Sequence, residues 1–179
     1  MQRIHLKDKE FELFITEAEI QTAVGRMAQQ IAADMAGKRP LFVGVLNGAF
    51  MFVADLMRAL NGSYELTFAR YSSYAGTSST GVLREIMPIS VDVKGRTVIL
   101  LEDIIDTGFT MSRVKAMLRE RGAEDVRLAT MLFKPESLKV DLQPDYVGLQ
   151  IPPAFIVGHG LDYDEMGRAY RDIYQVVEK

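Results

Sequence analysis

Short apolar runs alternate along this chain with segments of helical periodicity, and this alternation is the feature that most limits its fold. Leu41–Leu46 is an apolar run bounded by Pro40 and Asn47-Gly48, and apolar residues recur at helical spacing in Phe50–Leu60. Further apolar runs lie at 97–101 and 126–133, with a helical segment between them at 112–121. Buried strands that alternate with helices are typical of a parallel sheet covered on both faces. We therefore expect an α/β fold.

The remaining segments are expected to complete this fold. Residues 17–35 have the spacing of an amphipathic helix that Gly37 can end, and residues 64–71 have a strand pattern. Residues 72–81 are polar and lack apolar periodicity, which indicates a long loop. After Lys134 only short segments remain, at 146–150, 155–157 and 173–177. They fit one last core strand and a small accessory sheet, and no repeat or linker indicates a second domain.

Composition excludes several classes of function. With 48% hydrophobic and 25% charged residues among 179, the chain resembles globular proteins and not disordered, fibrous or membrane-spanning ones. Its net charge of -3 provides no broad cationic surface, so we expect neither nucleic acid nor a membrane as partner. The absence of cysteine excludes disulfides, thiolate-bound metal and a cysteine nucleophile. Residues 1–12 lack the apolar stretch of a signal peptide, so we expect a cytoplasmic protein.

An acidic run, Glu102-Asp103-Ile104-Ile105-Asp106-Thr107-Gly108, follows the apolar strand at 97–101. Ligands of open α/β sheets bind at the carboxyl ends of the strands. If the strand ends before Glu102, this residue and Asp103 can both turn to a vicinal diol and accept from its two hydroxyls. The small and hydroxyl residues after them lead into a helix, whose free N–H groups and dipole favour a phosphate. The spacing predicts a ribose-5-phosphate site.

Other interpretations of these residues lack part of their motif. An acidic pair after a strand also occurs in Walker B motifs, and Thr-Gly before a helix can be an ordinary cap. The chain has no glycine-rich loop that ends in Gly-Lys-Ser/Thr, which a P-loop protein requires. Gly158-His159-Gly160 lacks the third glycine of a dinucleotide fingerprint.

The segment 102–110 resembles the signature of the type I phosphoribosyltransferases. Four further motifs are similar to the hypoxanthine-guanine branch of that family: Leu46-Asn47-Gly48, Ser73-Tyr74, Lys134 and Gly160-Leu161-Asp162-Tyr163. The resemblance spans about residues 41–171, with the motifs in the family's order. It implies a parallel sheet flanked by helices, with a small hood formed by the N- and C-terminal segments. We predict one domain over residues 1–179, with its core at about 38–150 and its hood at about 1–16 and 151–179.

The resemblance also implies roles at the acidic run. Glu102 and Asp103 would hold the ribose hydroxyls of phosphoribosyl pyrophosphate, and Asp106 would lie beside the purine N7 as general base or proton shuttle. The residues that would bind the 5-phosphate are Thr107, Gly108, Phe109 and Thr110. Phe109 occupies a position that is often basic in relatives, so backbone donors would have to be sufficient there.

Three further elements would serve the pyrophosphate. Leu46-Asn47-Gly48 resembles the loop that binds it, with a cis peptide before Asn47, where many relatives carry lysine. Arg168 would help to hold the same group. Magnesium, which prefers oxygen ligands, is the expected cofactor, and its predicted protein ligands are Glu102, Asp103 and Asp162. Ser73-Tyr74 would begin a lid that excludes water.

The base would be read by residues farther along the chain. By resemblance, Lys134 donates to the purine 6-oxygen, Phe155 stacks on the base, the Ile156 main chain reads its edge, and Asp162 lies nearby. Lysine has donors and no acceptor, so it favours a 6-oxopurine over adenine. Judged without the family, Lys134 would be a solvated lysine, Phe155 and Ile156 core residues, and Asp162 a turn residue.

We therefore predict an enzyme that makes IMP, and GMP, from phosphoribosyl pyrophosphate and a 6-oxopurine. One alternative is a nucleotide-sensing regulator with this fold, and another is an enzyme that prefers xanthine. The resemblance implies a homodimer or homotetramer. His5 and His159 are assigned no chemical role.

Overall fold

The computed structural model describes residues 2–73 and 83–177, which form two β-sheets with helices around the larger one. The larger sheet has the strand order β5-β4-β3-β6-β7-β8 and the smaller one the order β1-β2-β10-β9. The strands are β1 (Arg3–Leu6), β2 (Lys9–Ile15), β3 (Leu41–Leu46), β4 (Glu65–Ser73), β5 (Leu83–Met87), β6 (Thr97–Ile105), β7 (Asp125–Phe133), β8 (Tyr146–Gln150), β9 (Ile156–Val157) and β10 (Ile173–Val176). The helices are α1 (Glu17–Asp34), α2 (Phe50–Leu60), α3 (Phe109–Glu120) and the short 3-10 helix η1 (Pro135–Ser137).

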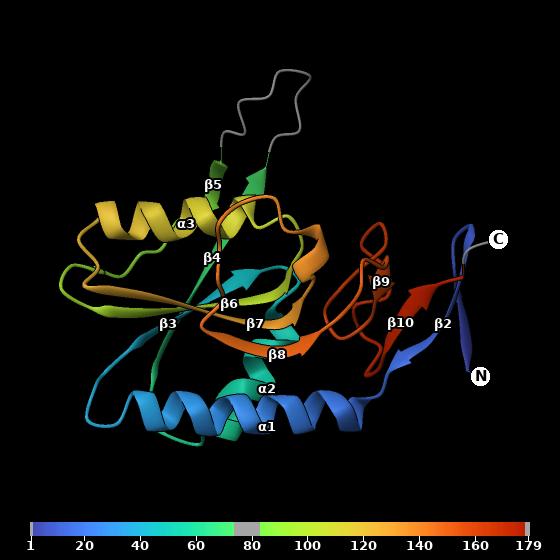
Figure 1. Ribbon diagram of the computed structural model, residues 1–179, viewed down its shortest axis with the longest axis horizontal. Coiled ribbons are helices and arrows are strands. Elements are labelled where there is room, and N and C mark those ends of the chain that lie inside the picture. The colour runs from blue at the N-terminus through green and yellow to red at the C-terminus, as the bar shows by residue number, and fades with distance from the viewer. Residues whose placement is uncertain (1, 74–82, 178–179) are drawn as a thin grey trace.

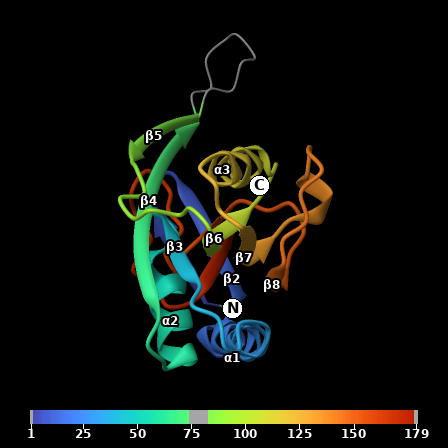
Figure 2. The ribbon, with the colours of Figure 1, turned by 90° about the vertical axis from the view of Figure 1, so that its left-hand side faces the viewer.

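The larger sheet is covered on both faces, as its apolar strands predict. Helices α1 and α2 lie along one face and α3 lies along the other, and the side view shows the twist of the strands between them (Figures 1 and 2). On β6, Ile99 and Leu101 pack into the cluster that contains α1 and α2, whereas Val98 and Leu100 pack into the cluster that contains α3. Alternate residues of a strand point to opposite faces, so a strand buried on both sides is apolar throughout.

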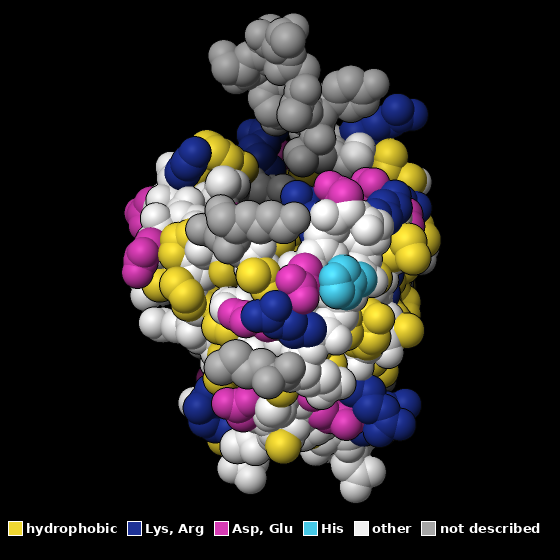
Figure 3. Space-filling view, turned by 90° about the vertical axis from the view of Figure 1, so that its right-hand side faces the viewer, with side chains coloured by type: hydrophobic (Ala, Val, Ile, Leu, Met, Phe, Trp, Pro, Cys, Tyr) yellow, Lys and Arg dark blue, Asp and Glu magenta, His cyan; other side chains and the backbone are white. Residues whose placement is uncertain are grey.

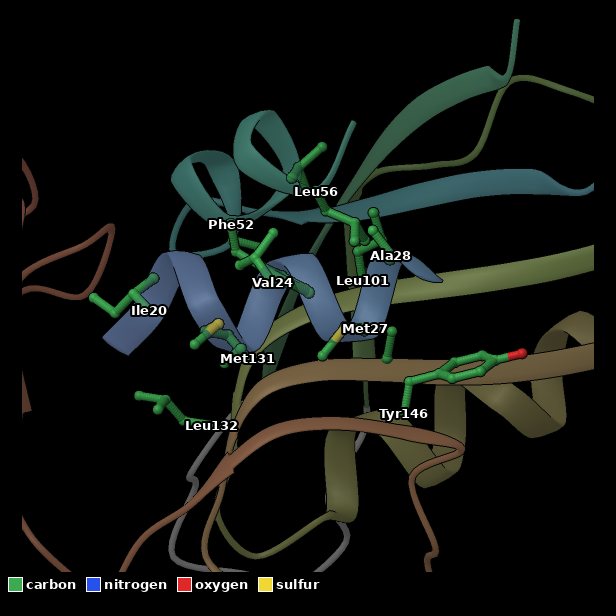
Figure 4. Packing of buried hydrophobic residues seen from close by; sticks show 14 of the residues in the cluster. Ile20, Val24, Met27, Ala28, Phe52, Leu56, Leu101, Met131, Leu132 and Tyr146 are labelled. Carbon is green, nitrogen blue, oxygen red and sulfur yellow. The ribbon is translucent and has the colours of Figure 1, made fainter. Parts of the chain in front are cut away.

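Helix α1 begins at a capping box in which Thr16 and Glu19 exchange hydrogen bonds with each other's backbone. Its apolar face packs against α2 and the sheet, where Val24, Met27 and Phe52 meet (Figure 4). Gly37 has a φ of 75°, a left-handed conformation that suits glycine after a helix, so the expected end is confirmed. The described residues include no helix long and apolar enough to cross a membrane.

The smaller sheet joins the two ends of the chain and is called the hood below. Strand β2 pairs with β10, which in turn pairs with β9, all antiparallel. A separate apolar cluster holds it, formed by Leu6, Phe11, Val157 and Tyr174. In the space-filling view of this side, acidic and basic side chains lie next to one another (Figure 3). The hood that the family resemblance implied is confirmed.

Three sequence-based expectations were wrong in detail, and three strands were not predicted. The larger sheet is not wholly parallel, because β5 pairs antiparallel with β4. Strand β6 does not end at Leu101 but continues through Ile105, where it still pairs with β7. Ser72 and Ser73 belong to β4 and not to a loop, while residues 74–82 lie outside the described part. Strands β1, β2 and β5 were not predicted because charged and apolar residues are mixed in them and most of their residues are partly exposed.

Candidate active site

Two carboxylates lie in the last part of β6. Glu102 and Asp103 are both within the strand, so its end does not bring them together as predicted. Glu102 Oε2 is buried and has no hydrogen-bond partner among the described residues. Burial raises the pKa of Glu102 well above its usual range, and the neighbouring charge of Asp103 raises it further. A buried acceptor without a donor suits a ligand that supplies hydroxyl groups or a cation.

Asp103 lies against the loop that follows β3. A Cβ atom added to Gly48 would lie 1.8 Å from Asp103 Oδ2, so only glycine allows this approach. The Leu46-Asn47 peptide in the same loop is cis. Burial raises the pKa of Asp103 to about 6, although backbone hydrogen bonds oppose this shift. The predicted pyrophosphate loop is therefore in contact with Asp103, one of the two predicted ribose carboxylates.

The segment after β6 opens into the N-terminus of α3. Gly108 is its N-cap residue, with a φ of 81°, and no side chain accepts a hydrogen bond from the first turn. Leu138, Val140 and Leu142 pack closely around Gly108, which leaves no room for a Cβ. The first-turn N–H groups are thus available to an anion. Thr107 and Thr110 are partly exposed there, and the Phe109 side chain is exposed.

Lys134, directly after β7, forms an ion pair with Asp106. Its Nζ lies 2.9 Å from Asp106 Oδ2, and its backbone N–H donates to the Ile105 carbonyl at 3.0 Å. The lysine side chain is 9% exposed and the aspartate side chain 51%, so a buried ammonium is aimed at a carboxylate that faces solvent. The predicted purine lysine and the predicted proton acceptor, 28 residues apart in the sequence, are therefore neighbours.

The hood reaches the same edge of the sheet through residues 158–168, called the hood loop below. A Cβ atom added to Gly160 would lie 2.0 Å from the Gly48 carbonyl oxygen, so the two backbones touch. Arg168 pairs with Asp162 at 2.9 Å and donates to the Gly160 carbonyl at 2.8 Å. The charge of Arg168 lowers the pKa of Asp103 and the charge of Asp162 raises it. Hood and core thus share one electrostatic environment.

The other predicted hood residues lie in or beside β9. Phe155 is exposed and stands 5.6 Å from the Tyr163 ring and 6.1 Å from the Phe11 ring, centroid to centroid. Ile156 of β9 is buried and pairs with Gln175 of β10. Ser73 ends β4, and Tyr74 lies outside the described residues.

Comparisons with known proteins identify the family. Residues 15–164 match the phosphoribosyl transferase domain. Over 155 residues the chain is 41% identical to the hypoxanthine-guanine phosphoribosyltransferase of Streptococcus pneumoniae, with 86% of each chain covered. The chain belongs to the phosphoribosyltransferase family. This phosphoribosyltransferase is also 38% identical over 158 residues to the Bacillus subtilis enzyme of the same name, with 88% of each chain covered.

Solved structures agree with this assignment. The phosphoribosyltransferase described here matches a hypoxanthine-guanine phosphoribosyltransferase of Bacillus anthracis with a TM-score of 0.88 at 38% identity, covering 93% of this chain and 98% of that one. It matches a hypoxanthine phosphoribosyltransferase of Staphylococcus aureus with a TM-score of 0.88 at 34% identity, covering 93% and 91%. The predicted family and type I fold are therefore confirmed.

Two residues in this region of the phosphoribosyltransferase were assigned no individual role from the sequence. Tyr163 was noted only as part of a family motif, yet its ring stands edge-on to Phe155 and its hydroxyl donates to Asp8 at 2.7 Å. His159 was given no role, yet it is buried 3.4 Å from Asp55 of α2. Its position between two glycines was the only available signal.

The carboxylates of the site fit a hard cation in their chemistry. Glu102 has an unpaired buried oxygen, and the oxygen ligands that magnesium prefers are present on Glu102, Asp103 and Asp162. Within residues 2–73 and 83–177, however, no three acidic, histidine or cysteine side chains are grouped closely enough to hold a metal by themselves.

Proposed function

We propose that this phosphoribosyltransferase transfers the 5-phosphoribosyl group of phosphoribosyl pyrophosphate to N9 of hypoxanthine and of guanine, giving IMP or GMP and pyrophosphate. The Lys134–Asp106 ion pair carries the proposal. It joins a buried donor to a solvent-facing acceptor 2.9 Å away, and Asp106 lies in the chain between β6, which carries Glu102 and Asp103, and α3. The names of the relatives support the choice of bases.

Lys134 and Asp106 would read opposite features of the base. The Lys134 ammonium donates to the 6-oxygen of the purine, and Asp106 accepts from N7–H. As a bond forms between purine N9 and C1 of the ribose, the C1–O bond to pyrophosphate breaks, and the N7 proton passes to the Asp106 carboxylate. A 6-aminopurine would place donors against the lysine and leave it unpaired.

The sugar and its 5-phosphate would occupy the edge formed by β6 and α3. Glu102 and Asp103 accept from the ribose hydroxyls, which offsets the cost of burying unpaired carboxylate oxygens. The first turn of α3 holds the phosphate, through the backbone N–H groups and the two hydroxyls of Thr107 and Thr110. Phe109 contributes its N–H, because its exposed side chain has no donor.

The pyrophosphate would lie where the core and the hood loop meet. Leu46, Asn47 and Gly48 offer backbone groups, and Arg168 offers a guanidinium beside Asp162. Bound Mg²⁺ would neutralise the leaving pyrophosphate, held by substrate oxygens together with Glu102, Asp103 and Asp162. Asp103 and the Gly48 backbone touch, so the loop and the carboxylates would act on the same part of the donor.

The purine would lie against the hood. Phe155 is exposed and braced by Tyr163, so its free ring face can stack on a base. The Ile156 main chain would read the edge of the base, with Asp162 nearby. Ser73 and Tyr74 remain the predicted start of a lid. We further propose a cytoplasmic homodimer or homotetramer with small-molecule substrates.

A turnover assay tests the proposal. The protein is incubated with phosphoribosyl pyrophosphate, Mg²⁺ and one purine at a time: hypoxanthine, guanine, xanthine or adenine. We expect nucleotide and pyrophosphate from the first two, none from adenine, and loss of turnover when EDTA removes the metal. Faster turnover of xanthine would replace the proposed base preference. No product from any 6-oxopurine would overturn the enzyme and favour a nucleotide-binding regulator.

A further inference from the structure

His159 is held in an unusual backbone conformation inside the hood loop. It is 4% exposed and lies between Gly158 and Gly160, and the three residues have φ angles of 103°, 48° and 99°. Its N–H donates to the Tyr170 carbonyl at 2.8 Å. The glycines touch the Asp172 and Gly48 carbonyls so closely that neither can carry a side chain. The backbone that carries His159 is therefore closely confined by the segments around it.

Both ring nitrogens of His159 face acceptors. Nδ1 lies 3.3 Å from the Arg171 carbonyl oxygen in the hood, and Nε2 lies 3.4 Å from Asp55 Oδ2 on α2. The imidazole thus bridges the hood backbone and an acidic residue of the core. The ring donates a hydrogen bond from Nδ1 to the Arg171 carbonyl, whereas Nε2 only contacts Asp55 and has no hydrogen-bond partner among the described residues.

The surroundings of this contact belong to three elements. From α2, Asp55 pairs with Arg58 at 3.3 Å; from α1, Gln21 donates to Asp55 at 2.6 Å. Two polar contacts of Glu17 on α1 hold the hood's C-terminal segment. The Glu17 backbone N–H donates to Asp172 at 2.7 Å, and the Glu17 carboxylate lies 3.5 Å from Arg171. Burial lowers the pKa of His159, and the charges of Asp55 and Glu17 oppose this effect.

We propose that His159 is a positioning residue: by bridging Asp55 of α2 and the Arg171 carbonyl, it fixes the hood loop so that Gly160 rests on Gly48 and Arg168 faces the pyrophosphate. Its part in substrate binding rests on the proposed function. The bridge itself is independent of the proposed function, because all of its contacts are within the protein. Since α2 begins directly after the Leu46-Asn47-Gly48 loop, a contact with α2 sets the spacing between the two walls of the pyrophosphate site.

Hydrogen exchange on the ligand-free protein tests the bridge. His159→Phe keeps a ring and removes both nitrogens, His159→Gln keeps a donor, and His5→Phe is the matched control because His5 is exposed on β1. We expect faster exchange of the hood-loop amides in His159→Phe, including the Gly160 N–H that donates to Arg168. His159→Gln should restore part of the protection, and His5→Phe should match the wild type. Unchanged exchange in a folded His159→Phe protein would overturn the proposal.

Kinetics then separate positioning from general destabilisation. Loss of one hydrogen bond corresponds to about a two- to tenfold effect, so we expect KM for phosphoribosyl pyrophosphate to rise by about that factor in His159→Phe. The kcat and the KM for hypoxanthine should change less than twofold, and His159→Gln should recover part of the loss. Equal changes in both KM values, or none, would overturn the role in donor binding. If the wild type shows no turnover, the proposed function fails, while the exchange experiment still decides the bridge.

Discussion

Two regions contribute to one site by different means: the carboxyl ends of the strands of the larger sheet, called the edge below, and the hood. At the edge, Glu102 and Asp103 lie in β6 and Asp106 follows it directly, and the pairing of β6 with β7 continues through Ile105 and holds this backbone. In the hood, Asp162 and Arg168 stand on a loop that has several left-handed residues and is held by turn hydrogen bonds instead of strand pairing. A rigid edge suits groups that act on the reacting atoms, whereas a loop suits groups that hold the rest of the donor.

This difference leads to an expectation for mutants. Substitutions at the edge should lower kcat, because those side chains would contact the base and the ribose directly. Substitutions in the hood should raise KM for phosphoribosyl pyrophosphate, because they would shift the wall against the pyrophosphate. A hood variant with a purely chemical defect, or an edge variant with a purely binding defect, would contradict this division.

Asp106→Asn should have the largest effect. The amide keeps the shape of the side chain but accepts no proton, and general acid–base catalysis contributes about 10²- to 10⁴-fold. We expect kcat for hypoxanthine to fall by about that factor with little change in KM, measured by steady-state assay. Asp141→Asn, on an exposed residue, is the control. Full turnover in Asp106→Asn would remove Asp106 from proton transfer and weaken the case for chemistry at the edge.

Lys134→Met tests the other partner of the same pair. Loss of a buried, charge-assisted donor should lower kcat/KM for hypoxanthine by about a hundredfold and reduce the discrimination against adenine. The exposed Lys139 on the following segment provides Lys139→Met as the control, which should retain activity. If both variants discriminate between hypoxanthine and adenine as the wild type does, Lys134 does not select the base, and residues of the hood would have to do so.

The pH dependence of stability probes the buried carboxylates. The pKa of Asp103 rises from 3.8 to about 6 in the folded protein. Between these values the native state keeps a proton that the unfolded state has lost, so stability falls as pH rises from about 4 to 6 and is then constant for this group. The loss is about 3 kcal/mol by the conversion from pKa to free energy.

Urea unfolding between pH 4 and pH 8 measures this effect. Asp103→Asn removes the titration, so its free energy of unfolding should decline less over that range than that of the wild type. Glu102, whose pKa is also raised, should add a decline of the same sign that becomes smaller in Asp103→Asn, because the Asp103 charge contributes to that shift. If the free energies of unfolding of the two proteins changed in parallel with pH, burial would not raise the pKa of Asp103, and its carboxylate would be more exposed to solvent than in this structure.

The sequence predicted the edge more completely than the hood, for physical reasons. Leu41–Leu46, Tyr146–Gln150 and Phe50–Leu60 were located without error because burial on both faces, or along one helical face, leaves a periodic pattern. Strand β5 was missed because only its pairing with β4 makes it a strand. Strand β6 was ended too early because Glu102 and Asp103 are polar residues inside a strand, where a site overrides the apolar pattern.

The contacts of the hood had no comparable signal. The approach of Gly160 to Gly48 joins residues more than a hundred positions apart, and the spacing of His159 from Asp55 is similar. Only the family resemblance indicated Asp162 and Arg168, and the ion pair between them comes from the tertiary fold. Local patterns predict elements, whereas contacts between distant turns depend on how the elements pack.

Gly160→Ala should have the smallest effect of the four and tests the hood directly. The residue has a φ of 99°, and a Cβ would lie 2.0 Å from the Gly48 carbonyl, so the hood loop must move. We expect a loss of about 1–3 kcal/mol in unfolding free energy and a higher KM for phosphoribosyl pyrophosphate with kcat nearly unchanged. The control is Gly25→Ala in α1, where nothing lies within 4 Å and alanine should stabilise by about 0.5–1 kcal/mol. A drop in kcat alone for Gly160→Ala would show that the hood takes part in the chemistry, because displacement of a purely binding wall leaves the bound reactants in place.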